Sequence, residues 1–592
     1  MKIKYLDGKR FHAGLLAGGR AVIRSKNYLN KINVFPVADA DTGTNLAMTM
    51  QAILDKSKIG RTLHETLSSV SDSALSGARG NSGIIFAQYL HSLSNELPKK
   101  GVISVKKFAE GAQNAVKHLY DSLMNPVEGT MLTVIREWAE SIEEQSHKTT
   151  DFMHLLTDSL NVARKSLQET PKKLKVLADA GVVDAGASGF VDFLEGIVEF
   201  IHKGSLKGHA EVVIDEGLSD INEYHTEDPS EFRFCNETMI ADCKYPLNEL
   251  KKKISHFGDS LIVAGDQKKI HLHIHTNDPE GLFEVLHEVG SLSGIKVDDM
   301  HRQYEIAHER RYPIGIITES ACDLPDDILD KYQISQLPLG INFGDVQYLD
   351  KQTIQADKFY HKLKATAIHP NSAQPNFALT KTLMEFVSRH YDDVISVNIS
   401  DHLSGAYHTF STAAKTIPKA NIHLINTKQI SGSQGLIALR VAESIESGMS
   451  VEQIIEKSSK WIKNTVLYTD VPTLKYMIRS GRVKKFQGAI GTLLNLKPLV
   501  TLDDRGKSIL NGKSFTRAGN MNRTAKMVKT KLKTQKLWKY CIVHADNLKR
   551  AHQYEEILTT LTGQRPAYIM PISPVVGVHS GNGTVGVGVM YD

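Results

Sequence analysis

The sequence predicts a multidomain protein with an all-α N-terminal region, a small α+β middle region and an α/β C-terminal region. Its length of 592 residues exceeds what a single hydrophobic core supports. Apolar residues keep a helical period over the first third of the chain, and short apolar strands alternate with helical patterns over the last half. We expect the helical region at 1–205, an acidic, turn-rich linker at 206–230, the middle region at 231–305 and the last region at 313–592.

The composition is that of an ordinary soluble globular protein, with 41% hydrophobic and 23% charged residues. The formal net charge of +5 is small for this length, so nucleic acid is not an expected partner. No apolar run approaches the roughly 20 residues of a membrane span. The N-terminus lacks the apolar core of a secretion signal, and four scattered cysteines do not make a disulfide framework. We therefore expect a cytoplasmic protein.

Apolar stripes at helical spacing recur through residues 1–205. The first consists of Phe11, Leu15, Val22 and Leu29. Later ones are Leu46, Met50 and Ile53, then Phe86, Leu90 and Leu93, then Phe190, Leu194, Ile197 and Ile201. This spacing predicts a helical bundle, and the unusual chemistry lies in the loops between its helices.

The first such loop holds two carboxylates, Asp39 and Asp41, just before a helix. Two carboxylates two residues apart can converge on Mg²⁺, with Asn33 as a neutral oxygen ligand. The alternative is a helix N-cap, because Asp41 or Thr42 would cap the helix that follows.

The second loop, residues 76–83, carries three glycines immediately before a helix. Glycines let backbone amides approach an anion, and the helix N-terminus adds a favourable dipole. The loop is not a Walker A motif, because the terminal GK[ST] is missing; the alternative is a plain turn between helices. Two more loops, at 126–133 and 181–189, also lie between helices, and we expect the four to enclose a nucleotide together.

The motif order NVFPVADADTGTN, SGARGNSG, PVEGTMLTVIRE and GVVDAGASG closely resembles the nucleotide-binding domain of bacterial fatty acid kinases, which is related to the ADP-binding subunit of dihydroxyacetone kinase. The resemblance covers residues 8–203. It implies an eight-helix barrel that binds Mg-ATP, with Asp39 and Asp41 as the catalytic, magnesium-binding pair. Ala38 and Ala40 depart from the Pro and Gly usual in that family. The motifs and the resemblance together give the predicted nucleotide-binding set Asn33, Thr42, Gly43, Asn45, Gly80, Asn81, Ser82, Gly83, Thr130, Asp184 and Gly186.

The middle region is expected to contain strands at 261–264 and 270–275 and a helix over residues 279–294. His271, His273 and His275 alternate along the second strand and therefore share a face. With a thiolate such as Cys235 they could bind a tetrahedral zinc; the alternative is a solvated or hydrogen-bonded histidine face. The segment resembles the middle domain of the fatty acid kinase nucleotide subunit, which implies zinc ligands at Cys235, His273 and His275 and none at His271.

The third region predicts an α/β fold with a mainly parallel sheet, because strands at 314–317, 394–399 and 540–543 alternate with helical patterns. Ligands bind at the carboxyl ends of strands in such sheets. Hydroxyl, guanidinium and imidazole donors lie in loops of this kind and would suit an anionic head group. They are Ser372, Ser404, Arg482 and His579.

The motifs TESACDLP, LSGAY, SGRVKKFQGAIGTLLNLKPLV and HSGNG resemble the DegV family of fatty-acid-binding subunits over residues 313–592. This resemblance implies that Ser372 and Ser404 contact a fatty acid carboxylate, with Arg482 and His579 nearby. Ala373 stands where the family usually has a second hydroxyl.

Combining the regions predicts a fatty acid kinase that transfers the γ-phosphoryl group of ATP to a fatty acid carboxylate, giving acyl phosphate and ADP. The cofactors expected are Mg²⁺ with ATP/ADP, and Zn²⁺. A carboxylate is ionised at neutral pH, so no strong general base is required. Three alternatives stay open: a small hydroxy-ketone acceptor, a non-catalytic lipid carrier with a relic nucleotide domain, and a kinase subunit that serves separate lipid-binding partners. Candidate partners are a fatty acid, a membrane acyltransferase that uses acyl phosphate, and a second copy of the chain in a homodimer.

Overall fold

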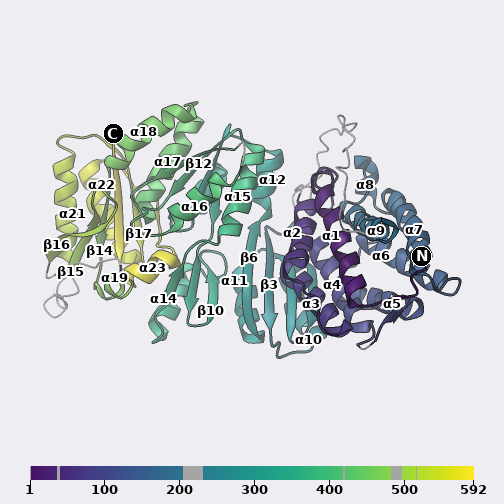
Figure 1. Cartoon of the computed structure of the whole chain (residues 1–592). Coiled ribbons are helices and arrows are strands. Elements are labelled where there is room, and N and C mark those ends of the chain that lie inside the picture. The colour runs from purple at the N-terminus through teal and green to yellow at the C-terminus, as the bar shows by residue number, and fades with distance from the viewer. Residues whose placement is uncertain are drawn as a thin grey trace. The chain divides into compact units, whose positions relative to one another are not determined.

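The computed structural model describes residues 2–35, 41–99, 101–203, 231–417, 420–481, 497–514 and 516–592. The chain divides into two compact units, residues 1–304 and 305–592 (Figure 1). Two of the predicted site residues, Asp39 and Arg482, lie outside the described residues, and so does the linker predicted at 206–230.

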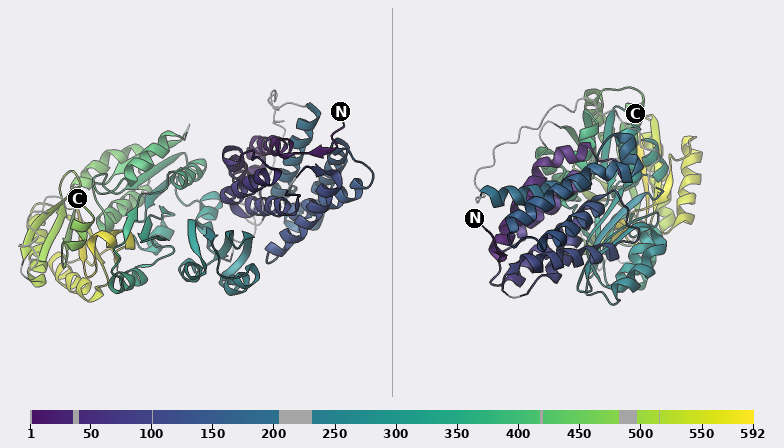
Figure 2. Two further views of the ribbon diagram at one scale, coloured as in Figure 1. Left: turned by 60° about the horizontal axis from the view of Figure 1, so that its bottom comes forward. Right: turned by 90° about the vertical axis from the view of Figure 1, so that its right-hand side faces the viewer.

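The first part of unit one is helical. Its helices are α1 (Gly8–Lys31), α2 (Thr42–Lys56), α3 (Leu63–Gly77), α4 (Gly80–Glu96), α5 (Val105–Ser122), α6 (Met131–Ser146), α7 (Phe152–Lys173), the short α8 (Lys175–Ala180) and α9 (Ala185–Lys203). Each long helix packs against the next, and α9 packs against both α7 and α1, so the ring closes. The long helices lie side by side in the right-hand view of Figure 2. The eight-helix barrel is therefore confirmed, with α8 as a single extra turn. A two-stranded antiparallel ribbon, β1 (Tyr5–Leu6) with β2 (Ile103–Ser104), pairs the N-terminal segment with the start of α5.

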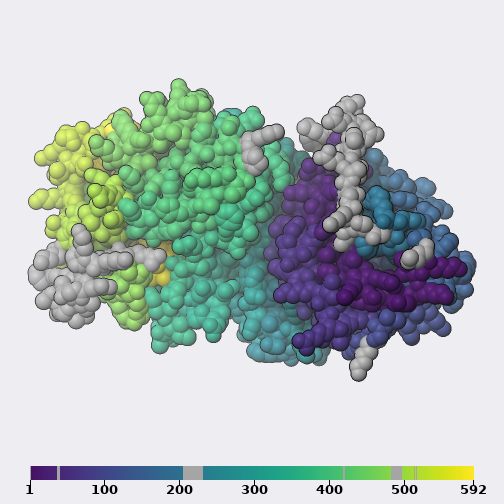
Figure 3. Space-filling view, viewed as in Figure 1, coloured from purple at the N-terminus to yellow at the C-terminus, as the bar shows by residue number. Residues whose placement is uncertain are grey.

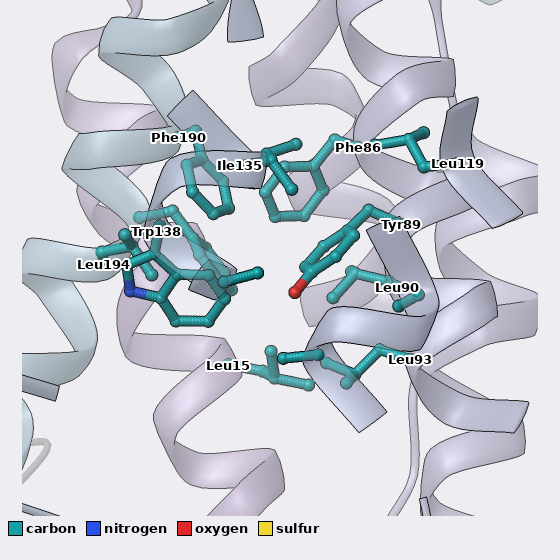
Figure 4. Close-up of a cluster of buried hydrophobic side chains, with 14 of the residues drawn as sticks. Leu15, Phe86, Tyr89, Leu90, Leu93, Leu119, Ile135, Trp138, Phe190 and Leu194 are labelled. Carbon is teal, nitrogen blue, oxygen red and sulfur yellow. The ribbon is translucent and has the colours of Figure 1, made fainter. Parts of the chain in front are cut away.

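The predicted apolar stripes point into the barrel, and Phe11, Leu46 and Phe86 are buried there. Figure 4 shows aromatic rings from three helices facing one another at its centre. Trp138 of α6 lies edge-on to Tyr89 of α4 and to Phe190 of α9, with ring centroids 6.4 and 5.7 Å apart. These side chains do not fill the interior completely, because they surround an apolar cavity of about 1620 Å³.

The second part of unit one is a four-stranded antiparallel sheet in the order β4-β5-β3-β6. Its elements are β3 (Phe234–Ala241), α10 (Leu247–Ile254), the 3-10 helix η1 (Ser255–Phe257), β4 (Gly258–Asp266), β5 (Lys269–Thr276), α11 (Pro279–Val289), β6 (Ser291–Asp299) and α12 (Met300–His308). The helix predicted over 279–294 is too long. It ends at Val289, because the sequence after Gly290 changes to a period of two and forms β6 instead.

The sheet packs directly on the barrel. Ile262 and Ala264 of β4 belong to the barrel's hydrophobic cluster. The Gly265 N–H donates to Gln88 Oε1 of α4 across 2.7 Å. His271 Nδ1 lies 2.8 Å from the carbonyl oxygen of Leu75 on α3, which gives this histidine a structural partner. Figure 3 shows the teal surface of the sheet region lying against the purple surface of the first helices.

Unit two contains three sheets among its described residues. The strands are β7 (Ile314–Glu319), β8 (Ser335–Leu337), β9 (Gly340–Phe343), β10 (Val346–Leu349), β11 (Asn371–Ala373), β12 (Asp393–Asn398), β13 (Asn421–Asn426), β14 (Thr465–Asp470), β15 (Lys497–Leu502), β16 (Ser508–Ser514), β17 (Leu537–His544), β18 (Ile569–Pro571) and β19 (Val585–Tyr591). The helices are α13 (Asp326–Lys331), α14 (Ala356–Ala365), α15 (Phe377–His390), α16 (Ala406–Lys415), α17 (Ser431–Glu446), α18 (Val451–Lys463), α19 (Lys475–Arg479), α21 (Arg517–Lys531), α22 (Leu548–Thr562) and α23 (Pro574–Ser580).

The predicted parallel arrangement holds for only one of these sheets. The order β13-β12-β7-β8 is parallel throughout, and β10-β9-β11 is antiparallel. The largest sheet, β16-β15-β14-β19-β17-β18, is antiparallel except for the β17–β18 pair. Prediction of a mainly parallel fold is wrong here because β15 and β16 form a hairpin, and because the last strand, β19, inserts antiparallel between β14 and β17. Helix α17 is almost wholly buried and packs against strands of both larger sheets.

None of the described helices has a stretch that is both long and apolar enough to span a bilayer.

Candidate functional site

The N-terminus of α2 holds the first predicted loop's described carboxylate. Asp41 occupies the cap position of the helix, but its carboxylate makes no capping hydrogen bond. Instead Asn30 of α1 accepts from the Thr44 N–H at 2.9 Å and donates to Thr44 Oγ1 at 3.0 Å. Thr42 Oγ1 donates to Asn33 Oδ1 across 2.7 Å. The helix-cap alternative therefore does not account for the Asp41 carboxylate.

The second loop packs against the first at the N-terminus of α4. Gly80 has φ +57, and a Cβ there would lie 2.4 Å from Asn45 Nδ2, so only glycine fits. A Cβ on Gly83 would lie 2.5 Å from Thr49 Oγ1. Between them, Asn81 Oδ1 is buried without a hydrogen-bond partner among the described residues. An orphaned buried acceptor beside a helix N-terminus indicates a place for a ligand.

The fourth loop reaches the second, whereas Thr130 and Asp184 serve as helix caps. A Cβ on Gly186 would lie 2.9 Å from Ser82 Oγ. Thr130 caps α6, and Asp184 Oδ1 accepts from the Ala187 N–H at 2.7 Å at the start of α9. Burial raises the pKa of the Asp184 carboxyl to about 6. These residues fix the helix ends behind the site.

A cavity of about 550 Å³ opens where the loops meet the sheet. On the barrel side it is lined by Asn33, Asp41, Thr42, Asn45, Gly80, Asn81 and Ser82. On the sheet side it is lined by Cys235, Glu237, His273, His275, Lys296 and Asp298, with Met300 and Gln303 beyond them. The residues predicted for a nucleotide and those predicted for zinc therefore line the same cavity. Gly43, Gly83, Thr130, Asp184 and Gly186 are not part of this lining.

The sheet side consists of two cross-strand rows on one face. Cys235 of β3 pairs with His275 of β5 and with Asp298 of β6. Two residues further along β3, Glu237 pairs with His273 and Lys296 in the same way. Because side chains on one face repeat every second residue, both rows face the barrel loops.

The predicted zinc ligands come together. Cys235 Sγ lies 3.7 Å from His273 Nδ1, and the Nε2 atoms of His273 and His275 are 3.2 Å apart. One ligand atom from each residue lies within 4.8 Å of the others. His275 Nδ1 also lies 3.4 Å from Asp259 Oδ1, which orients its ring. This donor set fits a tetrahedral zinc with three protein ligands and one open position.

Burial sets the protonation of these groups. It lowers the pKa of His273 to about 4, so the imidazole is the neutral form that binds metals. Burial, together with the charges of Glu237 and Asp298, raises the pKa of the Cys235 thiol well above its ordinary value. A cation bound between these residues would offset that effect and stabilise the thiolate.

Glu237 connects the cluster to the second loop. Its Oε1 accepts from the Gly80 N–H at 2.7 Å and lies 3.7 Å from His273 Nδ1. Burial alone would raise the pKa of Glu237, but Lys296 and the imidazole of His273 outweigh burial and hold that pKa well below its usual range. Reasoning from sequence missed Glu237, Lys296 and Asp298. The alternation of apolar and charged residues in SGIKVDD, residues 293–299, was the available signal for the last two.

Unit two holds a second cavity, of about 900 Å³, with a mainly aliphatic lining. Ser372, Ala373, Ser404 and His579 all line it. Ser372 Oγ lies 2.9 Å from His579 Nε2, and Ser404 Oγ accepts from the Ala406 N–H at 3.2 Å. A few polar groups in an apolar pocket suit an elongated ligand with a small polar head.

Two buried carboxylates anchor α23, the short helix that carries His579. Asp323 Oδ1 accepts from the Ser573 N–H at 3.1 Å, and Asp350 Oδ1 accepts from the Val575 N–H at 3.0 Å. Burial raises the pKa of Asp350 to about 7. The position of His579 in the cavity therefore depends on these helix-end contacts.

Family models match three successive parts of the chain. The DAK2 domain matches residues 36–199, the middle domain of the fatty acid kinase A-like family matches 231–307, and the DegV family, described as uncharacterised proteins, matches 313–592.

Curated relatives include an uncharacterized protein of Staphylococcus aureus (strain USA300), 31% identical over 313 residues, which cover 51% of this chain and 57% of the relative. An uncharacterized protein of Staphylococcus saprophyticus is 31% identical over 326 residues, covering 53% and 58%. The matched part of this chain thus spans a little over half the length of these relatives.

Among solved structures, DegV of Bacillus subtilis, titled a fatty acid binding protein, has 25% identity and a TM-score of 0.45; the match covers 48% of this chain and all of that one. A DegV family protein of Thermus thermophilus, titled for fatty acid binding, has 24% identity and a TM-score of 0.44, covering 47% and 100%. With the family matches in chain order, this protein is a fusion of a DAK2 domain, a middle domain of the fatty acid kinase A-like family and a DegV-family domain.

Proposed function

We propose that this chain is a fatty acid kinase, which transfers the γ-phosphoryl group of ATP to the carboxylate of a fatty acid. The cavity between barrel and sheet carries this proposal, because Asp41, the glycine loop and the orphaned Asn81 Oδ1 all face into it. Its chemistry suits a nucleotide triphosphate: backbone amides and a helix N-terminus for phosphates, and a carboxylate for the accompanying cation.

The barrel loops would bind the phosphates through the N-terminus of α4. The Gly80 N–H already donates to Glu237, so the amides of Asn81 and Ser82 are the donors that remain for phosphate oxygens. Asp41, with Asp39 of the same loop, would hold Mg²⁺, which supplies charge neutralisation for phosphoryl transfer. Asn33 is held beside them by Thr42.

The acceptor would come from the cavity of unit two. Its aliphatic lining suits an acyl chain, and Ser372, Ser404 and His579 supply donors for the carboxylate. A carboxylate oxygen forms the new bond to the γ-phosphorus as the bond to the departing ADP oxygen breaks. No proton is transferred, so positioning and charge neutralisation are what the protein must provide.

Cys235, His273 and His275 would hold zinc on the opposite wall of the nucleotide cavity. Bound there, zinc would add a positive charge close to the phosphates and fix the sheet face against the barrel.

The test combines two measurements on the full chain. Native mass spectrometry of the purified protein reports bound lipid, and hydroxylamine traps acyl phosphate as hydroxamate when Mg-ATP and a long-chain fatty acid are supplied. Hydroxamate that depends on ATP, magnesium and fatty acid supports the proposal. A lipid-loaded protein that binds Mg-ATP and forms no hydroxamate contradicts it. Hydroxamate that forms only after a separate lipid-binding protein is added identifies a kinase that serves other carriers.

A further inference from the structure

One strand of the middle sheet brings a lysine into the nucleotide cavity. Lys296 of β6 is the only lysine or arginine among the described residues that line this cavity. Its side chain is 17% exposed, which is low for a residue type that usually extends into solvent.

The strand register directs the Lys296 side chain toward the barrel. Ile295 and Val297, on either side of it, are 8% exposed and belong to the opposite face of the strand. Lys296 pairs across β3 with Glu237, whose carboxylate contacts the Gly80 N–H. The lysine is therefore one cross-strand position away from the residue that touches the glycine loop.

The charge around Lys296 is predominantly negative. Asp41, Glu237 and Asp298 line the same cavity, and Lys296 Nζ forms an ion pair with Asp298 Oδ2. Burial would lower the pKa of Lys296, but Asp298 and Glu237 outweigh burial and raise that pKa above its ordinary value. The ammonium thus stays charged, and it has three donors on a flexible stem that can exchange one oxygen partner for another.

We propose that Lys296 is a phosphate-binding residue of the nucleotide site, contributed by the middle sheet to the ATP that the barrel loops hold. This inference rests on the proposed function. Mg-ATP is still an anion, and it would enter a cavity whose lining already carries three carboxylates. A cation is needed on the wall opposite the loops, and phosphoryl-transfer sites use lysine for this purpose. Asp298 is then the partner of Lys296 before the nucleotide binds.

Isothermal titration of Mg-ATP into the full chain tests this directly. Lys296→Met should weaken Mg-ATP binding by about tenfold or more, because a charge-assisted contact is lost. The matched control is Lys269→Met. Lys269 lies on the adjoining β5 and contacts Ser76 Oγ at 2.8 Å, outside the cavity. It should bind Mg-ATP within about twofold of the unaltered chain. Zinc content and circular dichroism of both variants report whether the sheet is intact.

Asp298→Asn separates phosphate binding from a purely structural ion pair. If Lys296 binds phosphate, this variant should keep or tighten Mg-ATP binding, because the lysine loses a competing partner. Equal weakening by Lys296→Met and Asp298→Asn would overturn the inference, and so would unchanged binding by Lys296→Met. A chain that binds Mg-ATP but forms no hydroxamate would contradict the proposed function alone, since the binding comparison still decides the role of Lys296. A chain that binds no Mg-ATP would overturn both.

Discussion

The backbone N–H of Gly80 donates a hydrogen bond of 2.7 Å to Glu237 Oε1, although the two residues are 157 positions apart in the chain. This contact joins the glycine loop of the DAK2 domain to the sheet of the middle domain. Arg79 Nη1 lies 3.9 Å from the other carboxylate oxygen, Oε2. A phosphate loop and a metal cluster are thus held by one buried side chain.

Removing the Glu237 carboxylate should destabilise unit one. Glu237→Ala leaves the Gly80 N–H without its acceptor and removes a buried charge beside Lys296, which should lower the free energy of unfolding by about 3 kcal/mol. Glu237→Gln keeps an acceptor oxygen and should cost less. Urea unfolding followed by tryptophan fluorescence measures both, since Trp138 lies in the barrel. Equal losses for the two variants would show that the hydrogen bond to Gly80 contributes little.

Asp41→Asn should reduce acyl phosphate formation by about 100- to 1,000-fold, because a neutral amide is a poor magnesium ligand. Bound lipid should stay unchanged, since the acyl cavity belongs to the other unit. Asp55→Asn is the matched control, because Asp55 is exposed on the same helix. Hydroxamate assays and native mass spectrometry of the same samples check both expectations. Full activity in Asp41→Asn would remove this carboxylate from the magnesium site.

Cys235→Ser should abolish zinc binding, whereas Cys243→Ser should not. Both cysteines belong to the middle domain, but only Cys235 lies with His273 and His275. Metal analysis of the unaltered chain should find about one zinc per chain, and Cys235→Ser should retain little of it. Its thermal unfolding should also begin at lower temperature, because bound metal stabilises the folded state by mass action. Zinc retained by Cys235→Ser would place the metal elsewhere.

Ser372→Ala and Ser404→Ala should each weaken fatty acid binding by about tenfold, the effect of one lost hydrogen bond to a charged group. Ser372→Ala also removes the contact to His579 Nε2. Mg-ATP affinity should not change. Ser459→Ala, an exposed position on α18, is the control. Competition with a fluorescent fatty acid measures the affinities. Unchanged lipid affinity in both serine variants would mean that the carboxylate binds elsewhere in the cavity.

Asp350 should make unit two less stable as the pH rises. Its folded pKa of about 7 lies above that of an unfolded aspartate, about 4, so the native state holds the proton more tightly. The resulting stability is complete below pH 4 and is lost as the pH rises to 7, by at most about 4 kcal/mol. Asp350→Asn keeps an acceptor for the Val575 N–H and should not show this loss. Unfolding curves at several pH values compare the two, and the exposed Asp357→Asn should follow the unaltered chain.

Local patterns in the sequence were enough to predict most of unit one. The helical stripes from Phe11 to Leu93 lie inside the barrel, and the histidine strand faces one way as alternation requires. Lys296 and Asp298 were missed because the helical pattern of α11 was extended through Gly290 into β6. Glu237 was missed because its role depends on Gly80, and no local pattern reports a contact over that separation. The antiparallel sheet of unit two was missed for the same reason, since the pairing of β14 with β19 joins residues more than a hundred positions apart.

The two rows on β3 also constrain how this chain can change. Cys235 and Glu237 reach the cavity only because one residue separates them. Inserting a single residue between them would turn one of the two to the far side of the sheet. The metal ligand and the anchor of the glycine loop would then face in opposite directions, although every side chain of both rows was still encoded. Substitutions can alter the two functions separately, but a change in length at this point would remove one of them outright.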